Sequence, residues 1–449
     1  MLRKLLWERM KRFENQTLSD EKNTLTYGEA LVFAESFARK LTVSKVGVFC
    51  NSELHAGLGI LACIAAGVTA VPLSARYGET HVGRIVQHIG LSHTITDESG
   101  VLAVKQIAPI LPEPEDLSDT ALVMCTSGTT GSPKGAMITL DALTTNLLDI
   151  ERYFAINQSD TILIARPLYH CAVLTGEFLI SLCRGLNIRF YNGDFNPIRL
   201  LQAISAQQAT VLGGTPTLFY HLCQMAGRSK QPLPLRVAAV SGECMTETAA
   251  KIMRKSLADA DIYNVYGLTE ASPRVSALPP ELFDEHPLSV GFPLQSVQAK
   301  VDSGELLIRG KTVMKGYYND PAQTNRALSR EWLHTGDGVM IDSAGRITIK
   351  GRLDNMIIRA GMNIFPQEIE SALKADPRVT EALVYGERNG VTQRLCLKIT
   401  ADGLTKSDIM AICRESLSAY EIPDTVEIVD ALPRNASGKL LRPKVVIPA

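Results

Sequence analysis

The residues best able to do chemistry lie in one short loop. Residues 125–137, CTSGTTGSPKGAM, place glycines and hydroxyl side chains ahead of a single lysine, Lys134. Backbone N–H groups in such a loop can turn toward an anion that the lysine also reaches, because few side chains stand in the way. The usual P-loop has Gly-Lys followed by Ser or Thr, whereas here Pro133 precedes the lysine and Gly135 follows it. The loop alone therefore indicates either a polyphosphate-binding site or a surface turn.

Further short motifs follow this loop in a fixed order. They are PLYH (167–170), YGLTE (266–270), GELLIRG (304–310), HTGDG (334–338), GRLDNMIIRAGMNIFPQEIE (351–370) and NASGK (435–439). A single short motif can arise by chance, but a complete ordered set cannot. Together with TSGTTGSPKG they resemble the adenylate-forming superfamily of acyl-CoA synthetases, luciferases and peptide-synthetase adenylation domains, and acyl-CoA ligases most closely. LTYGEAL (25–31) and AAGVTAVPLS (65–74) extend the resemblance over nearly the whole chain.

The resemblance implies a two-step ligation. A carboxylic acid, fatty or aryl, reacts with ATP to give an acyl-adenylate and pyrophosphate, and a thiol then displaces AMP. The implied cofactors are ATP, Mg²⁺ and coenzyme A, or the phosphopantetheine of a carrier protein in place of coenzyme A. The first step brings a carboxylate to the α-phosphate, so the repulsion between two anions has to be offset by fixed cations and a metal ion.

The resemblance assigns the catalytic and phosphate-binding roles to specific residues. Lys439 of NASGK matches the mobile catalytic lysine that bridges carboxylate and α-phosphate oxygens. Glu270 of YGLTE matches the Mg²⁺-coordinating glutamate, and Thr269 its neighbour on the α-phosphate. One carboxylate suffices, because proteins often hold Mg²⁺ with one or two carboxylates plus phosphates and waters. The implied contacts of the loop with the β- and γ-phosphates are Thr126, Ser127, Gly128, Thr129, Thr130 and Lys134.

The nucleoside roles fall on two other motifs. Asp337 of HTGDG matches the ribose-binding aspartate, whose carboxylate can accept hydrogen bonds from both ribose hydroxyls. Arg352 of GRLD would add a further ribose contact. Tyr266, with Gly267 after it, would stack near the adenine.

The domain organisation follows from length and from the same resemblance. A chain of 449 residues is too long for one hydrophobic core, so two or three domains are expected. We expect residues 1–353 to form an AMP-binding domain and residues 354–449 a small mobile domain that carries Lys439. Asp354 matches the hinge, and rotation about it would withdraw the lysine and present Gly361 to the pantetheine arm. The absence of a side chain at Gly361 would leave a narrow tunnel open.

The acid is less closely defined than the reaction. His170 of PLYH matches the aromatic or histidine gate beside the substrate carboxylate. Amino-acid-activating domains place an aspartate next, for the ammonium group, where this chain has Cys171. An α-amino acid would leave its cation unpaired, which is costly, so an apolar acyl or aryl acid is expected. Glu177 is either a residue near a helix N-terminus or a substrate contact. In the second case, an acid that carries an amine is an alternative substrate.

Two features give different indications of the thiol acceptor. RAGMNIFPQEIE (359–370) is typical of medium- and long-chain acyl-CoA ligases, whereas Glu243 of SGECMT is similar to carrier-protein-loading domains. We expect coenzyme A, with a stand-alone enzyme that loads a carrier protein as the alternative. A non-catalytic ligand-binding relative would be expected to have lost Lys439, Glu270 or Asp337, and all three are present.

Alternating segments of the chain position these motifs. Strand-like and helical segments in turn predict an α/β fold with a parallel sheet in the large domain. Short strand-like segments after about residue 290, joined by Asp-Ser-Gly and Ser-Ala-Gly turns, predict a β-rich subdomain, and the last segments a small α+β domain. The predicted helices are 28–41, 55–67, 81–90, 176–185, 199–208, 246–257 and 365–377. The predicted strands of the large domain are 45–50, 68–74, 92–97, 161–167, 187–192, 209–216, 236–242 and 261–267.

Composition narrows the class of protein. The hydrophobic fraction of 45% and charged fraction of 21% are ordinary for a globular domain, and a net charge of -1 argues against a nucleic-acid partner. The nine cysteines are scattered with no Cys-x-x-Cys pair, which predicts reduced thiols in the cytoplasm rather than disulfides or zinc. Residues 1–13 have helical apolar spacing, which predicts a helix docked on the body, or alternatively on a membrane surface. No transmembrane segment is expected, and either a monomer or a homodimer is compatible with the sequence.

Overall fold

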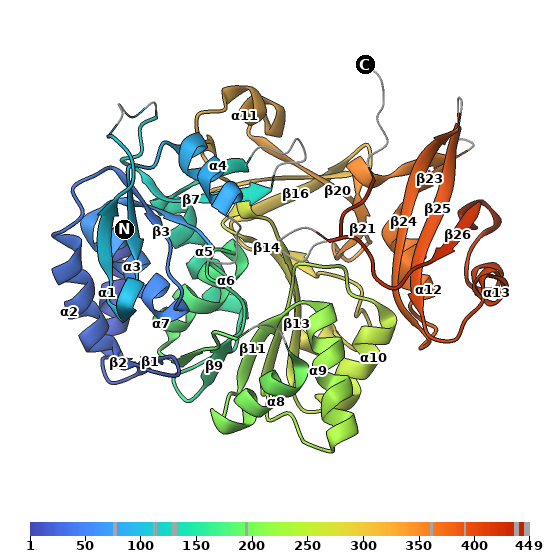
Figure 1. Ribbon diagram of the computed structural model, residues 1–449, viewed down its shortest axis with the longest axis horizontal. Helices are drawn as coiled ribbons and strands as arrows, with labels where there is room; N and C mark the ends of the chain where they lie inside the picture. Colours follow the sequence, from blue (N-terminus) through green and yellow to red (C-terminus); the bar gives the residue numbers. More distant parts are fainter. Residues whose placement is uncertain are drawn as a thin grey trace.

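The computed structural model describes residues 1–74, 79–110, 113, 115–127, 133–193, 196–359, 362–389, 392–434 and 440–443. Its larger sheet has the strand order β15-β14-β13-β12-β11-β9-β10-β1-β2 (Figure 1). The strands from β13 to β1 pair in parallel, and antiparallel strands close both edges. The strands are β1 (Thr17–Ser19), β2 (Thr24–Thr26), β9 (Thr161–Ile164), β10 (Asn187–Phe190), β11 (Val211–Gly214), β12 (Val237–Val240), β13 (Asp261–Gly267), β14 (Arg274–Leu278) and β15 (Phe292–Pro293).

Helices cover both faces of the larger sheet. Alternate residues of a strand face opposite sides, so Leu212 packs with α8 (Pro197–Ala206), α9 (Pro216–Ser229) and α10 (Glu247–Ser256), whereas Val211 faces the main core. That core contains α5 (Leu140–Tyr153), α6 (Cys171–Val173), the π-helix η2 (Leu174–Leu179) and α7 (Ile180–Arg184). Figure 1 shows α8, α9 and α10 together on the outer face.

A second sheet has the strand order β18-β8-β7-β4-β3-β5-β6, with parallel pairs at its centre. Its strands are β3 (Lys45–Val48), β4 (Thr69–Pro72), β5 (His93–Thr96), β6 (Ala103–Gln106), β7 (Thr120–Ser127), β8 (Pro133–Thr139) and β18 (Gly316–Tyr317). The helices beside it are α2 (Tyr27–Ala38), α3 (Glu53–Ala66) and α4 (Glu79–Ile89), with η1 (Glu98–Gly100) before β6. Strands β7 and β8 form the hairpin that carries the Gly-rich loop.

Helix α3 joins the two sheets because it is apolar on nearly all sides. A Cβ on Gly57 would lie 2.9 Å from the Phe178 ring of η2, and one on Gly59 would lie 3.3 Å from Val48 of β3. These close approaches require glycine at position 57, and they bring the π-helix next to the second sheet.

The β-rich part is antiparallel, as expected. It consists of β16 (Val297–Asp302), β17 (Glu305–Gly310), β19 (Leu328–Ser329), β20 (Trp332–Ile341) and β21 (Ile347–Arg352). Helix α11 (Pro321–Ala327) packs beside it, whereas the short helix η3 (Thr269–Ala271) contacts β8 and η4 (Pro280–Leu282) contacts β13.

The C-terminal elements lie to one side of the molecule (Figure 1) and share a separate hydrophobic core. They are η5 (Leu353–Asn355), β22 (Ile357–Arg359), β23 (Met362–Ile364), α12 (Pro366–Leu373), β24 (Val379–Asn389), β25 (Thr392–Ala401), α13 (Lys406–Ser416), η6 (Ala419–Glu421) and β26 (Thr425–Ile428). The predicted fold class, a mixed α/β domain followed by a small α+β domain, is confirmed, and the boundary at residue 354 stays a prediction.

The N-terminal helix α1 (Leu2–Arg12) docks on the protein body. Leu2, Leu6 and Met10 are fully buried, and the helix packs against α2, α5 and α7. Trp7 donates a hydrogen bond from Nε1 to Glu35 Oε1 at 2.8 Å. The apolar face is therefore covered by protein and does not lie on a membrane surface. Within the described residues, none of the helices combines the length and apolar character that crossing a bilayer requires.

We expect Leu6→Ala to lower the free energy of unfolding by about 2–5 kcal/mol, because it leaves a cavity beneath a docked helix. Urea denaturation followed by circular dichroism measures this. Glu8→Ala is the control, because the Glu8 side chain is 64% exposed and pairs only with Lys4 on the same helix. Equal, small effects of both substitutions would contradict the docked helix.

Candidate active site

The candidate site lies at one edge of the larger sheet. Strands β9, β11, β12 and β13 run parallel, so their carboxyl ends meet at that edge. His170 lies beyond β9, Glu243 follows β12, and Tyr266 and Gly267 end β13. Ligands in α/β proteins commonly bind outside the carboxyl ends of such strands.

Most of the predicted site residues are described. Lys134 lies in β8, Thr269 and Glu270 in η3, Asp337 in β20, Arg352 at the end of β21 and Asp354 in η5, while Thr126 and Ser127 end β7. The predicted residues Gly128, Thr129, Thr130, Gly361 and Lys439 lie outside the described residues.

The predicted nucleoside-binding residues contact one another. Tyr266 donates a hydrogen bond from its hydroxyl to Asp337 Oδ2 at 2.5 Å. Arg352 lies opposite Asp337 in the β20–β21 pair, with Nη1 3.5 Å from Asp337 Oδ1 and 2.7 Å from the carbonyl oxygen of Thr335. Its Nε also lies 3.3 Å from Asp354 Oδ1. One guanidinium therefore links the predicted ribose-binding carboxylate to the predicted hinge.

Burial controls the protonation of Asp337, which is only 8% exposed. Burial raises the pKa of this carboxyl, although the Arg352 charge and the Tyr266 hydroxyl act in the opposite direction. Ionisation of this carboxyl in the fold thus carries a desolvation cost. Such an arrangement is typical of a group retained for binding rather than for stability.

The predicted phosphate-binding and metal-binding residues meet at Tyr317. The Tyr317 hydroxyl donates a hydrogen bond to Glu270 Oε1 at 2.8 Å, and Lys134 Nζ lies 5.2 Å from the centre of the Tyr317 ring. Lys134 also donates to Gln323 Oε1 at 3.4 Å. Pairing of β18 with β8, which places Tyr317 opposite Ala136, brings the tyrosine to this position.

Glu270 fits a shared magnesium site better than a protein cage. Among the described residues, no group of three or more His, Cys, Asp or Glu side chains could hold a metal ion. Glu270 would therefore hold Mg²⁺ together with phosphate oxygens and waters. The Tyr317 hydroxyl occupies one carboxylate oxygen of Glu270 and leaves the other available.

In the helical segment that follows His170, the Glu177 side chain is engaged in an ion pair. It is 1% exposed, lies in the π-helix η2, and accepts from Arg166 Nη2 at 2.5 Å. Its carboxylate also lies against the backbone of Gly213, where a Cβ would be 2.4 Å from Cδ. Glu177 thus lies in the first turn of η2, where Oε1 pairs with Arg166 and Oε2 is buried without a hydrogen-bond partner. A contact between Glu177 and an amine-bearing substrate stays a prediction.

Glu243 has a structural role beside the site. Its Oε2 accepts a hydrogen bond from Thr217 Oγ1 at 2.6 Å and from the Thr217 backbone N–H at 3.3 Å. Thr217 lies in the first turn of α9, where N–H groups lack helical partners. Glu243 therefore stabilises the start of α9, and a carrier protein as the thiol acceptor stays a prediction.

Sequence reasoning missed Tyr317, Gln323 and Arg166. Tyr317 and Gln323 follow the GELLIRG motif within GYYNDPAQ, where glycine, aromatic and turn residues give a weak local signal. Arg166 immediately precedes PLYH. A positively charged residue next to a site motif could have been identified from the sequence as a candidate site residue.

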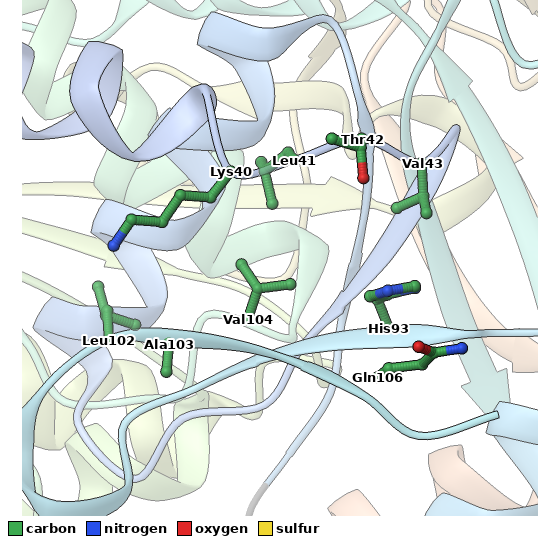
Figure 2. Close-up of a pocket in the computed structure, with 9 residues that line it drawn as sticks. All are labelled: Lys40, Leu41, Thr42, Val43, His93, Leu102, Ala103, Val104 and Gln106. Atoms are coloured by element: carbon green, nitrogen blue, oxygen red, sulfur yellow. The ribbon is translucent and has the colours of Figure 1, made fainter.

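A pocket of about 500 Å³ lies elsewhere, between the end of α2 and the β5–β6 hairpin. Figure 2 shows its lining residues, which include Lys40, His93 and Gln106. None of the predicted site residues lines it, so this pocket is not the candidate active site.

Comparisons with known proteins cover most of the chain. The family model described as AMP-binding enzyme matches residues 6–318, and the model of the AMP-binding enzyme C-terminal domain matches residues 368–439. A feruloyl-CoA synthase of an Amycolatopsis species is 30% identical over 421 residues, which cover 86% of this chain and 85% of the relative. A 2-succinylbenzoate–CoA ligase of Bacillus velezensis is 32% identical over 365 residues, which cover 78% of this chain and 74% of the relative.

A solved structure matches the fold over almost the full length. The o-succinylbenzoate coenzyme A synthetase of Bacillus subtilis, in complex with ATP and magnesium ion, has a TM-score of 0.85 and 26% sequence identity. The match covers 98% of this chain and 98% of that structure.

We expect Asp337→Asn to change how stability depends on pH. Because the pKa of Asp337 is raised in the fold, the stability linked to this group is present below its unfolded pKa and is lost as pH rises through the folded one. Relative to the unsubstituted protein, the variant should therefore gain free energy of unfolding as pH rises above the unfolded pKa of about 4. Urea denaturation at several pH values measures this difference.

Asp342, directly after β20, is the matched control with the opposite sign. Hydrogen bonding from the Arg346 backbone lowers the pKa of Asp342, so its contribution is present above the unfolded pKa and lost as pH falls. Asp342→Asn should lose stability relative to the parent as pH rises. The same pH trend for both variants would contradict the burial effect at Asp337.

Proposed function

This chain belongs to the AMP-binding enzyme family, and from that premise we propose that it ligates a carboxylic acid to coenzyme A with ATP. The acid forms an acyl-adenylate with release of pyrophosphate, and the thiol of coenzyme A then displaces AMP. The named relatives that act on feruloyl and 2-succinylbenzoate groups as CoA ligases support this reaction class. The observation that carries the proposal is the meeting of Lys134 and Glu270 at Tyr317.

Nucleotide binding divides between two groups of residues. Asp337 and Arg352 bind the ribose, and Tyr266 stacks near the adenine while its hydroxyl orients Asp337. Lys134 contacts the β- and γ-phosphates, together with the loop residues Thr126, Ser127, Gly128, Thr129 and Thr130. Thr269 contacts the α-phosphate next to Glu270. This arrangement orients the α-phosphate toward the acid before any bond changes.

Glu270 would hold Mg²⁺, which would supply positive charge to the phosphate oxygens when bound. The Tyr317 hydroxyl keeps the Glu270 carboxylate in one orientation, and the Tyr317 ring keeps the Lys134 ammonium close by. Lys439 adds the last positive charge where the carboxylate oxygen attacks the α-phosphorus. These fixed charges offset the repulsion between the two anions, and pyrophosphate leaves as the new bond forms.

The two half-reactions use two positions of the C-terminal domain. Residues 1–353 form the body and residues 354–449 the mobile domain, with Asp354 as the hinge. The ion pair of Arg352 with Asp354 connects the hinge to Asp337, so ribose binding and hinge position act on the same guanidinium. After rotation Lys439 leaves the site and Gly361 faces the pantetheine arm.

The proposal also specifies the thiol acceptor, the cellular compartment and the oligomeric state. Coenzyme A is the thiol, and the phosphopantetheine of a carrier protein is the alternative that a side-by-side acceptor assay would separate. The free cysteines support a cytoplasmic enzyme, which acts as a monomer or a homodimer. His170 lies beside the substrate carboxylate, and the Arg166 charge paired with Glu177 disfavours an amine-bearing acid.

The proposed function is tested with Lys439→Ala. Pyrophosphate release with a panel of carboxylic acids should fall at least ~100-fold, because the variant lacks the charge at the reacting centre. Thioester formation from a supplied acyl-adenylate and coenzyme A should be retained. Equal losses in the two half-reactions would contradict the two positions, and no acyl-adenylate from any acid with the parent enzyme would contradict the function.

Tyr317→Phe tests the positioning of Glu270. The variant keeps the ring beside Lys134 and loses only the hydroxyl, so the magnesium concentration for half-maximal adenylate formation should rise roughly tenfold. Tyr318→Phe is the matched control, because the Tyr318 hydroxyl bonds Lys45 and Glu113 away from Glu270. The same magnesium requirement in both variants and the parent would show that Tyr317 does not position Glu270.

A further inference from the structure

Three charged side chains, referred to below as the cluster, are buried in segments beside the motifs of the proposed site. Glu177 and Arg274 are 1% and 3% exposed, and the Arg166 side chain is 15% exposed. Arg166 follows β9, Glu177 lies in η2, and Arg274 begins β14 directly after the η3 segment that holds Glu270. The three groups thus come from the segments that build the acid end of the proposed site.

The charges of this cluster do not balance. Arg166 and Glu177 form a 2.5 Å ion pair and neutralise each other. No carboxylate of the described residues forms an ion pair with Arg274, and Arg274 Nε is buried without a hydrogen-bond partner. The contacts of Asn146 with Arg274 involve only the Arg274 backbone. The cluster therefore holds one net positive charge on Arg274.

Arg274 lies against the chain segment that follows His170. A Cβ on Gly176 would be 2.5 Å from Arg274 Nη2 and 2.8 Å from Cζ, so only glycine leaves room for the guanidinium there. Burial raises the pKa of the Cys171 thiol to about 12. The negative charge of Glu270 also raises this pKa, whereas the positive charge of Arg274 lowers it. Arg274 is thus near both Cys171 and the environment of Glu270.

The neutral neighbours of Arg274 do not compensate its charge. Burial raises the pKa of Tyr153, although Arg274 acts to lower it, so the Tyr153 hydroxyl stays protonated and uncharged. The Thr175 hydroxyl of the same segment is fully buried and lies against the Cys171 thiol. A buried guanidinium without a counter-charge is costly, and so is a buried donor without an acceptor. A bound anion would relieve both costs.

We propose that Arg274 binds a second carboxylate of the substrate, so that the preferred acid is a dicarboxylic acid. The planar guanidinium suits bidentate pairing with a carboxylate, and it holds the far end of the acid while the other carboxylate reaches the α-phosphate near His170. Thr175 donates to the same distal group. The inference rests on the proposed function and specifies its substrate class.

The unsubstituted enzyme gives the first test. ATP–pyrophosphate exchange is measured with straight-chain dicarboxylic acids of several lengths and with the monomethyl ester of each, which has the same chain without the second charge. For the best chain length, kcat/KM for the diacid should exceed that of its ester by about 10-fold to 100-fold, the range expected for a charged hydrogen-bonded contact. Equal or better use of the ester overturns the inference and leaves the proposed function standing.

Arg274→Gln gives the second test. It should lower kcat/KM for the diacid by about 10-fold to 100-fold and leave the ester within about twofold, while Arg274→Lys should retain part of the preference. Arg189→Gln is the control, because Arg189 in β10 binds Ser19 and Thr17. Equal losses for diacid and ester in Arg274→Gln overturn the inference. No exchange with any acid in the unsubstituted enzyme overturns the proposed function and this inference with it.

Discussion

The hydrogen bond from Tyr317 to Glu270 is the contact on which the site depends. The same tyrosine ring lies beside Lys134, so one side chain holds an anion for the metal and a cation for the phosphates at a fixed spacing. Because Tyr317 contacts both side chains, it keeps the Lys134 ammonium and the Glu270 carboxylate on either side of one residue. Two anionic reactants can be brought together only if the positive charge is positioned before they arrive.

The fold brings Tyr317, Glu270 and Lys134 together from distant parts of the chain. Glu270 comes from the carboxyl edge of the larger sheet, Lys134 from the hairpin of the second sheet, and Tyr317 from the short strand β18 on that hairpin. Helix α3 joins the sheets through the close approach at Gly57. A shift of α3 would therefore change the distance between the metal-binding and phosphate-binding residues without altering either one.

Much of this architecture could be predicted, because it is encoded in local patterns. The apolar run at 55–67 predicts the buried helix α3, and the alternation of strands and helices predicts the parallel sheet. Helix α5 lay outside the predicted segments because its buried face includes Thr144, Asn146 and Asp149, which hide the apolar period. The pairings of Arg166 with Glu177 and of Tyr317 with Glu270 depend on tertiary packing, and no local spacing specifies them.

A double-mutant cycle on MgATP binding tests the central contact most directly. If Tyr317 acts through the Glu270 carboxylate, Tyr317→Phe weakens MgATP binding in the parent enzyme but has no further effect once Glu270→Ala has removed the acceptor. Isothermal titration of the parent, the two single variants and the double variant gives the coupling. A loss from Tyr317→Phe that is the same with and without Glu270 would contradict the account.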